Sequence, residues 1–225
     1  MAYKNVRIAM DCCGDFQGIC VKSINSSERS FHVSKINSSL KSIVRLVYDS
    51  MERMGLEISC IKEMVLTTGP GRLTGVKTSM GFALGFGLGA DGVSIFGMNR
   101  LDVLSHCIDG CTLCTIILKS HGHFCFMCRY DVYGMIRKRV QEPICADKSF
   151  IFSAIQEDEV VMGDLPEIRS YKNGYYMNQE DIVKKVTNLL VDFCDRTLYF
   201  EKDIKPFFLR PFRLIREKGG DRIAF

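Results

Sequence analysis

The first hundred residues alternate between apolar runs and amphipathic stretches, which predicts alternating strands and helices. Short apolar runs bounded by turn residues predict strands at 5–12, 16–23, 27–34, 63–69 and 93–98. Apolar residues spaced three and four apart predict helices at 39–54, 74–89 and 99–107. Because the first three strands follow one another and the later ones alternate with helices, we expect an α/β unit that begins with an antiparallel meander.

The second half of the chain has a less regular pattern. Residues 111–118 and 123–130 predict a hairpin whose turn is "KSHG", and "RKRVQEP" continues its sheet. An amphipathic pattern over 179–194 predicts a long helix. The other predicted elements are a helix at 147–156, a strand at 159–164 and a loop at 165–178. We place two subdomains at 1–107 and 108–225.

A glycine-rich loop, "TTGPGRLTG", joins the strand at 63–69 to the helix at 74–89. Gly69 and Gly71 permit positive φ, and Pro70 stiffens the turn. The backbone N–H groups of such a loop can bind an anion at a helix N-terminus, although a tight turn with nothing bound fits the same residues. The loop itself matches neither the G-x-x-x-x-G-K-[ST] nor the G-x-G-x-x-G pattern. The candidate phosphate-loop residues are Asp11, Gly69, Pro70, Gly71, Thr74 and Gly75.

The helix that follows this loop is apolar on nearly all sides, so it must be buried on nearly all sides. Gly81, Gly85 and Gly89 repeat every four residues and form one ridge, which another helix backbone can approach closely. Its own sheet covers only one side, and we expect a partner protein to cover the rest, together with the helix at 39–54. The predicted interface residues are Leu40, Ile43, Val44, Val47, Met51, Val76, Met80, Gly81, Leu84, Gly85 and Leu88.

Composition and charge bear on whether the protein binds nucleic acid, is secreted or spans a membrane. The formal net charge of +4 neither demands nor excludes nucleic acid. Five basic residues lie in the last sixteen positions, and we interpret this cluster as a solvated tail. The eleven cysteines, with no secretory signal before them, predict free thiols and the cytoplasm. The longest weakly charged run, 78–90, is shorter than the roughly 20 residues that span a bilayer.

The segment "CTLCTIILKSHGHFCFMC" contains two C-x-x-C pairs and two histidines, which is one possible pattern for zinc. A zinc knuckle needs each pair in a tight turn, whereas these pairs lie in predicted strands. On a strand, residues three apart point to opposite faces, so the paired sulfur atoms diverge. We therefore expect the cysteines to be small buried apolar side chains and the segment to hold no metal.

Several motifs together resemble the TsaB family. "GPGRLTGVKTSMGFALGFG", followed by "VSIFGMNRLDVLSH", is similar to the family's "GPGSFTGLR" loop, helix and "GVSTLEAL" segment. "RIAMDCCGDFQGICV" resembles its opening "LAIDTSTxxxSVAL", with Asp11 at the place of the family's aspartate. Gly122 matches the glycine of its "DARRGEVY" hairpin, and "KPFFLRP" resembles its "PxYLR" signature.

The resemblance implies an actin-like ATPase fold with two RNase H-like halves, the second of them reduced. It implies a non-catalytic subunit of the machinery that makes N6-threonylcarbamoyladenosine in tRNA. The implied partners are a TsaD-type catalytic paralogue, bound through the two N-terminal helices, and a small TsaE-type ATPase. Without its partner the chain would form homodimers, and tRNA would be reached only through the complex.

Three departures from the family pattern weaken nucleotide binding by this chain. Cys12-Cys13 replaces Thr-Ser, Arg72-Leu73 replaces Ser-Phe, and Leu118-Lys119-Ser120 replaces "DAR". We therefore assign no firm cofactor, and ATP or ADP could be bound only at the partner interface. The sequence contains no metal-binding H-x-x-x-H pair, no H-E-x-x-H and no G-x-S-x-G. The alternatives are an actin-fold ATPase or phosphotransferase that uses Asp11, and the zinc protein discussed above.

Overall fold

The computed structural model describes residues 5–35, 40–90, 92–110, 112–193, 213–217 and 220–224. The chain divides into two compact units, which we describe separately. Unit 1 contains the chain up to Val103 and the helix α5(Gln179–Phe193), and unit 2 runs from Leu104 to Asn178. The expected division after residue 107 thus differs from the observed one, mainly because the last helix joins the first half.

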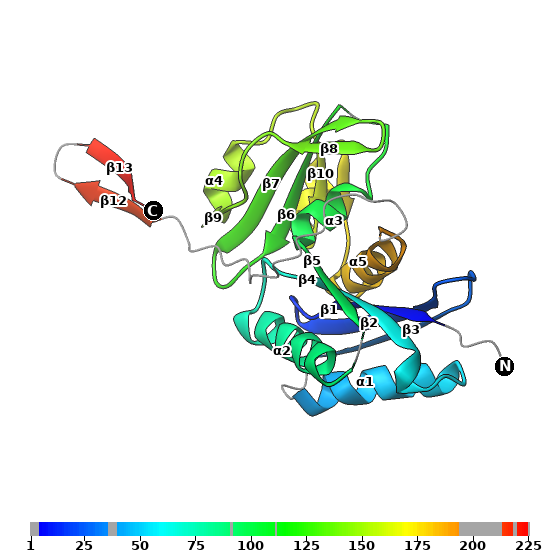
Figure 1. Cartoon of the computed structure of the whole chain (residues 1–225). Coiled ribbons are helices and arrows are strands. Elements are labelled where there is room, and N and C mark those ends of the chain that lie inside the picture. The colour runs from blue at the N-terminus through cyan, green and yellow to red at the C-terminus, as the bar shows by residue number, and fades with distance from the viewer. Residues whose placement is uncertain are drawn as a thin grey trace. The chain divides into compact units, whose positions relative to one another are not determined.

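Unit 1 is built on a five-stranded mixed sheet with the order β3-β2-β1-β4-β5 (Figure 1). The strands β1(Val6–Asp11), β2(Phe16–Ser23) and β3(Arg29–Lys35) form the predicted antiparallel meander. The strands β4(Ile61–Thr67) and β5(Ser94–Met98) continue the sheet in parallel with β1. All five expected strands of this half are therefore present.

Helices cover both faces of this sheet (Figure 1). On one face lie α1(Leu40–Arg53) and α2(Leu73–Gly89), which contact each other, and α5 packs on β1 and β2 from the other face. A Cβ atom at Gly18 of β2 would lie 2.3 Å from Cγ1 of Val183, so α5 approaches the sheet closely. Burial from both faces explains why every residue of β1 is buried. The periodicity of 179–194 predicts one buried face but does not identify the sheet that covers it.

Short elements complete unit 1. The 3₁₀ turn η1(Ile58–Cys60) leads into β4, and α3(Arg100–Ser105) follows β5. Asn99 caps α3, since its Oδ1 accepts the backbone N–H of Leu101 at 2.9 Å. Gly55 follows the end of α1 with φ of 63°, as expected for a helix-terminating glycine.

Unit 2 repeats the strand order of unit 1 in a smaller form. Its main strands are β6(Leu113–Lys119), β7(Phe124–Tyr133), β8(Ile136–Arg139), β10(Val160–Gly163) and β11(Gly174–Tyr176). Their order is β11-β10-β6-β7-β8, so the first strand of each unit lies between an antiparallel meander and two parallel strands. An unpredicted strand, β9(Ile144–Asp147), also pairs with β7.

The connections of unit 2 are short. The helix α4(Lys148–Ser153) has six residues, where α1 has fourteen. The predicted loop at 165–178 is wrong, because it contains the 3₁₀ turn η2(Pro166–Ser170) and β11. Isolated apolar residues such as Ile168, which is fully buried, hold this segment against the unit. Hydrophobic periodicity does not detect single buried residues of this kind.

Near the end of the chain, β12(Arg213–Glu217) and β13(Gly220–Ala224) form an antiparallel hairpin. Our interpretation of this basic segment as a solvated tail did not include that hairpin. The "KPFFLRP" motif at 205–211 lies outside the described residues. Within the described ranges, no helix is both long and apolar enough to cross a membrane.

Candidate interaction surface

Two glycines of α2 pack closely within unit 1. A Cβ atom at Gly75 would lie 1.8 Å from the carbonyl oxygen of Cys12. A Cβ atom at Gly87 would lie 2.6 Å from Cδ1 of Ile95. A side chain at Gly75 would overlap the backbone and push α2 away from its own sheet, whereas the terminal methyl group of Ile95 could turn aside for a Cβ atom at Gly87.

Three other glycines of α2 have no such role in this chain. A Cβ atom at Gly81, Gly85 or Gly89 would have no neighbour within 4 Å among the described residues, and none of the three has a positive φ. A glycine inside a helix costs about 0.5–1 kcal/mol relative to alanine, because it loses more backbone freedom on folding. Packing within unit 1 therefore does not explain why these positions are glycine.

Exposed leucines lie beside these glycines. Leu84 is 46% exposed and Leu88 is 92% exposed, whereas the opposite side of α2 is buried against the sheet. We call this face the α2 ridge: Gly81, Leu84, Gly85, Leu88 and Gly89. A row of glycines between exposed leucines gives a shallow apolar surface on which another helix can lie close.

The structure places some of the predicted interface residues on the surface and others in the core of unit 1. Gly81, Leu84, Gly85 and Leu88 are exposed, and Val44 is half-buried. The side chain of Leu40 lies outside the described part of the chain. Five predicted residues belong instead to the core of unit 1: Ile43, Val47, Met51, Val76 and Met80. Our assignment of these five to a partner interface is therefore corrected, because the apolar stripe of each helix packs within unit 1.

Asp11, the aspartate of the candidate phosphate loop, is fully buried and held by three donors. Its Oδ2 accepts the Nε–H of Arg100 at 2.9 Å, in an ion pair whose side chains are 4% and 0% exposed. Its Oδ1 accepts the hydroxyl of Thr67 at 2.8 Å and the backbone N–H of Cys13 at 3.2 Å. A carboxylate held in this way ties β1 to β4 and α3, and it is poorly placed to act as a general base.

The predicted phosphate loop packs against the turn after β1. A Cβ atom at Gly71 would lie 2.2 Å from the carbonyl oxygen of Cys13, and that oxygen accepts the Arg72 N–H at 2.7 Å. Gly69 has φ of 115°, its peptide bond to Pro70 is cis, and both residues are buried. Thr74 is exposed. The sequence correctly predicted the tight turn, and the backbone of residues 71–75 contacts Cys12 and Cys13 directly.

The two cysteines that replace the family's Thr-Ser are buried, neutral thiols. Burial raises the pKa of Cys13 to about 12, and the nearby carboxylate of Asp11 adds to this effect. The pKa of Cys12 is raised for the same reasons. The Cys13 sulfur lies 3.1 Å from the Thr67 hydroxyl. Because thiols are weak hydrogen-bond donors, this turn offers little to a phosphate.

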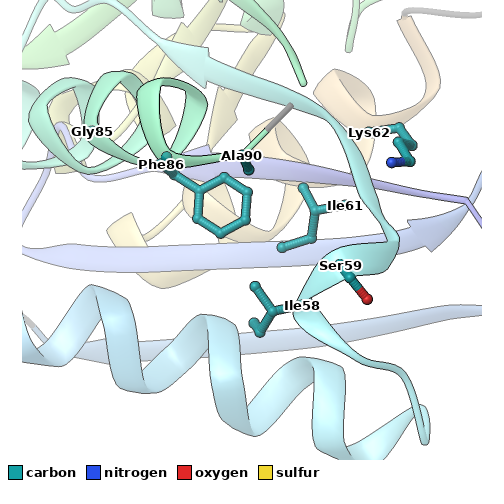
Figure 2. Close-up of a pocket in the computed structure, with 8 residues that line it drawn as sticks. Ile58, Ser59, Ile61, Lys62, Gly85, Phe86 and Ala90 are labelled. Atoms are coloured by element: carbon teal, nitrogen blue, oxygen red, sulfur yellow. The ribbon is translucent and has the colours of Figure 1, made fainter. Parts of the chain in front are cut away.

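A cavity of about 540 Å³ lies at the C-terminal end of α2 (Figure 2). Ile58 of η1, Ile61 of β4 and Phe86 of α2 form its apolar wall, and Figure 2 shows the Phe86 ring facing Ile61. Gly85 and Gly89 also line it, so the cavity is continuous with the α2 ridge. The sequence did not predict this cavity, since its two lining segments, 58–62 and 85–90, are 23 positions apart along the chain.

The cysteine-rich segment forms the predicted strands β6 and β7. Cys114, Cys125 and Cys128 are buried, and each lies opposite a residue other than cysteine in the hairpin register. Cys111 lies outside the described residues. Within the described ranges, no three His, Cys, Asp or Glu side chains are grouped so that they could hold a metal ion.

Sequence reasoning missed two residues that define this region. Arg100 neutralises Asp11 across 89 positions, and Lys62 lies on the lining of the cavity. A buried aspartate needs a cation or several donors, so Asp11 alone could have prompted a search for a basic partner. Nothing in the sequence distinguishes Arg100 or Lys62 from the chain's other basic residues.

Comparisons with known proteins find similar structures but no similar sequences. No family model and no curated protein matches the sequence. The structure is similar to an uncharacterised Pseudomonas aeruginosa protein described as similar to the peptidase YeaZ, with a TM-score of 0.68 at 12% identity. That match covers 92% of this chain and 100% of the other.

Two further solved structures give the same picture. YeaZ from Pseudomonas aeruginosa matches with a TM-score of 0.67 at 11% identity, covering 91% of this chain and 100% of YeaZ. The ethanolamine utilisation protein EutJ from Carboxydothermus hydrogenoformans matches at 0.53 and 8% identity, covering 83% of this chain and 88% of EutJ. Together with the two sheets, these likenesses confirm that the chain has the actin-like ATPase fold.

Proposed function

We propose that this chain is a TsaB-type, non-catalytic scaffold subunit of the machinery that makes N6-threonylcarbamoyladenosine in tRNA. It binds a TsaD-type catalytic paralogue through the α2 ridge. The observation that carries this proposal is the glycine row: three helical glycines with no packing role in the described chain, beside two exposed leucines. Its support from elsewhere is the order of the TsaB-like motifs and the likeness to the fold of YeaZ, a TsaB homologue.

In this proposal the chain contributes shape and apolar surface to the complex. The Asp11–Arg100 ion pair and the packed 69–75 loop favour a structural role for the region that would otherwise bind phosphate. ATP or ADP, where present, is bound together with the partner, a TsaE-type ATPase joins the pair, and tRNA is reached only through the complex. The complex operates in the cytoplasm.

A binding measurement with one ridge variant tests the proposal. The wild-type chain is mixed with the TsaD-type protein of the same organism, and the dissociation constant is measured by isothermal titration calorimetry. Gly85→Leu should weaken binding at least tenfold, because a side chain on the ridge separates the two backbones. Lys185→Leu, which adds the same side chain at an exposed position of α5, is the matched control and should bind like the wild type. No association of the wild-type chain would overturn the proposal.

Two measurements on the isolated chain address the alternatives. Phosphate release from ATP should stay at the background rate, and robust turnover by the chain alone would favour the phosphotransferase. Sedimentation at micromolar concentration should show homodimers that Gly85→Leu dissociates, because an exposed apolar ridge tends to be covered. A wild-type monomer at that concentration would contradict this part of the proposal.

A further inference from the structure

The cavity at the end of α2 is lined by apolar and small residues and by one basic residue. Ile58, Ile61 and Phe86 form its apolar wall. Lys62 lies apart from them along β4, as Figure 2 shows, and it forms no ion pair with any residue that the structure describes. Cavities of about 300–1,000 Å³ hold whole small molecules, so a volume of about 540 Å³ accommodates a single bulky side chain with room to spare.

The position of the cavity indicates what reaches it. Gly85 and Gly89 belong both to its lining and to the α2 ridge. A helix that lies along the ridge therefore passes over the mouth of the cavity. Side chains on that helix that are three or four residues apart project from the same face about 5–6 Å from each other.

The charge of this surface indicates the chemistry of the partner. The helix α2 contains no acidic residue, and its one charged side chain, Lys77, is exposed. Lys62 adds a second positive charge at the cavity. A carboxylate on the partner would complement these charges, whereas a basic residue would be repelled.

We propose that the cavity receives one bulky apolar side chain from a helix of the partner, and that an Asp or Glu one turn away on that helix pairs with Lys62. The inference rests on the proposed function, because the TsaD-type protein supplies the helix. It adds a specificity-determining site to the α2 ridge. The ridge can pack against any helix whose facing side chains are small. The cavity and Lys62 select a helix that carries a bulky apolar residue and an acidic residue one turn apart.

Two variants test the cavity against the ridge. Lys62→Glu should weaken binding of the TsaD-type protein at least tenfold in low salt, and the difference from wild type should shrink several-fold in 0.5 M salt as charges are screened (Debye length about 4 Å). Ala90→Phe, which places a ring at the cavity wall outside the α2 ridge, should weaken binding similarly at both salt concentrations. Lys185→Glu makes the same charge change on α5 and should bind like the wild type.

Each other outcome overturns the inference in a distinguishable way. If Gly85→Leu loses binding while Lys62→Glu and Ala90→Phe bind normally, the cavity inference is wrong and the proposed function stands. If both cavity variants abolish only self-association, the occupant is a second copy of this chain. Phenylacetate serves as a probe because it is a small apolar carboxylate. If it binds the isolated chain at micromolar concentration and changes the NMR chemical shifts of Lys62, the cavity is a small-molecule site. If the wild-type chain binds no TsaD-type protein, the proposed function fails as well.

Discussion

Units 1 and 2 have the same strand order but differ in what connects the strands. Each first strand, β1 or β6, lies between an antiparallel meander and two parallel strands. Between its parallel strands unit 1 has α2, with seventeen residues, and unit 2 has η2, with five. The two units thus share a strand order, and they diverge in the helices that connect the strands.

The contrast between η2 and α2 also concerns the surface that each connection exposes. The short turn η2 buries Ile168 and exposes its other four residues, and its five residues are too few to form an extended helical face. The long helix α2 buries one side in the core and exposes the α2 ridge on the other. A helix longer and more apolar than its own sheet requires is therefore the feature of unit 1 through which we propose that a partner binds.

The largest predicted effect comes from breaking the buried ion pair of each unit. Arg100→Met leaves the fully buried Asp11 carboxylate without its cation, which should cost about 3–5 kcal/mol of unfolding free energy. In unit 2, Arg129 pairs with the buried Glu159 at 2.8 Å, so Arg129→Met should cost a comparable amount. Urea denaturation measures both losses.

Hydrogen exchange on these two variants then sharpens the comparison. Arg100→Met should raise the rate of amide hydrogen exchange in β1 and β4, and Arg129→Met should raise that rate in β6 and β7. Equal increases in both sheets for either variant would show that the two units unfold as one. A loss below about 1 kcal/mol for Arg100→Met would contradict the role assigned to the ion pair.

Alanine substitutions at two glycines of α2 should change stability in opposite directions. Gly75→Ala should destabilise by about 1–3 kcal/mol or more, because its Cβ would overlap the Cys12 carbonyl oxygen. Gly85→Ala should stabilise the monomeric chain by about 0.5–1 kcal/mol, because its Cβ meets nothing within the chain and alanine favours the helix. Thermal unfolding followed by circular dichroism measures both.

Unit 2 offers a matched control for these substitutions. A Cβ atom at Gly163 would lie 1.7 Å from the carbonyl oxygen of Ile117, so Gly163→Ala should destabilise as Gly75→Ala does. If Gly85→Ala also destabilises the monomeric chain, the α2 ridge is covered within the chain itself, and the contrast between α2 and η2 fails.

Buried thiols in both units should make the protein less stable in alkali. The pKa of Cys13 in unit 1 and that of Cys125 in unit 2 are each raised to about 12 by burial. Below the unfolded pKa both states keep the proton, so stability does not depend on it. Above that value the unfolded chain loses a proton that the folded chain retains, and stability falls by up to about 1.4 kcal/mol per pH unit for Cys13.

Urea unfolding at pH 8 and pH 10 in the presence of a reductant measures this loss. Cys13→Ala should show a smaller fall between the two pH values than the wild type, and Cys125→Ala should do the same for unit 2. Identical falls in the wild type and both variants would mean that these thiols ionise in the folded protein.

The smallest predicted effect concerns the ion pairs that join α5 to the sheet of unit 1. Asp192 lies 2.8 Å from Lys22 and 3.2 Å from Arg29. Burial opposes its ionisation, but the hydrogen bonds from Lys22 and Arg29 outweigh it and lower the pKa of Asp192. Its contribution is thus present above the unfolded pKa and is lost as the pH falls. Because the pair is partly exposed, Asp192→Asn should cost less than about 1 kcal/mol, measured by urea denaturation, and the cost should shrink in high salt.

The sequence by itself determined most of the elements and their order. Alternating apolar runs located the five strands of unit 1 and the hairpin of unit 2, because burial of a face follows the local period of the chain. Spacing of four likewise placed Gly81, Gly85 and Gly89 on one ridge. The TsaB-like motifs indicated the actin-like fold, which the structure neighbours confirm.

Only the tertiary structure decided which partners these elements have. It joined α5 to unit 1, paired Asp11 with Arg100, and placed five predicted interface residues in the core. It also brought η1, β4 and the end of α2 together around the cavity. Periodicity shows that a residue is buried but not against what, since contacts between distant segments form only when the sheet is assembled.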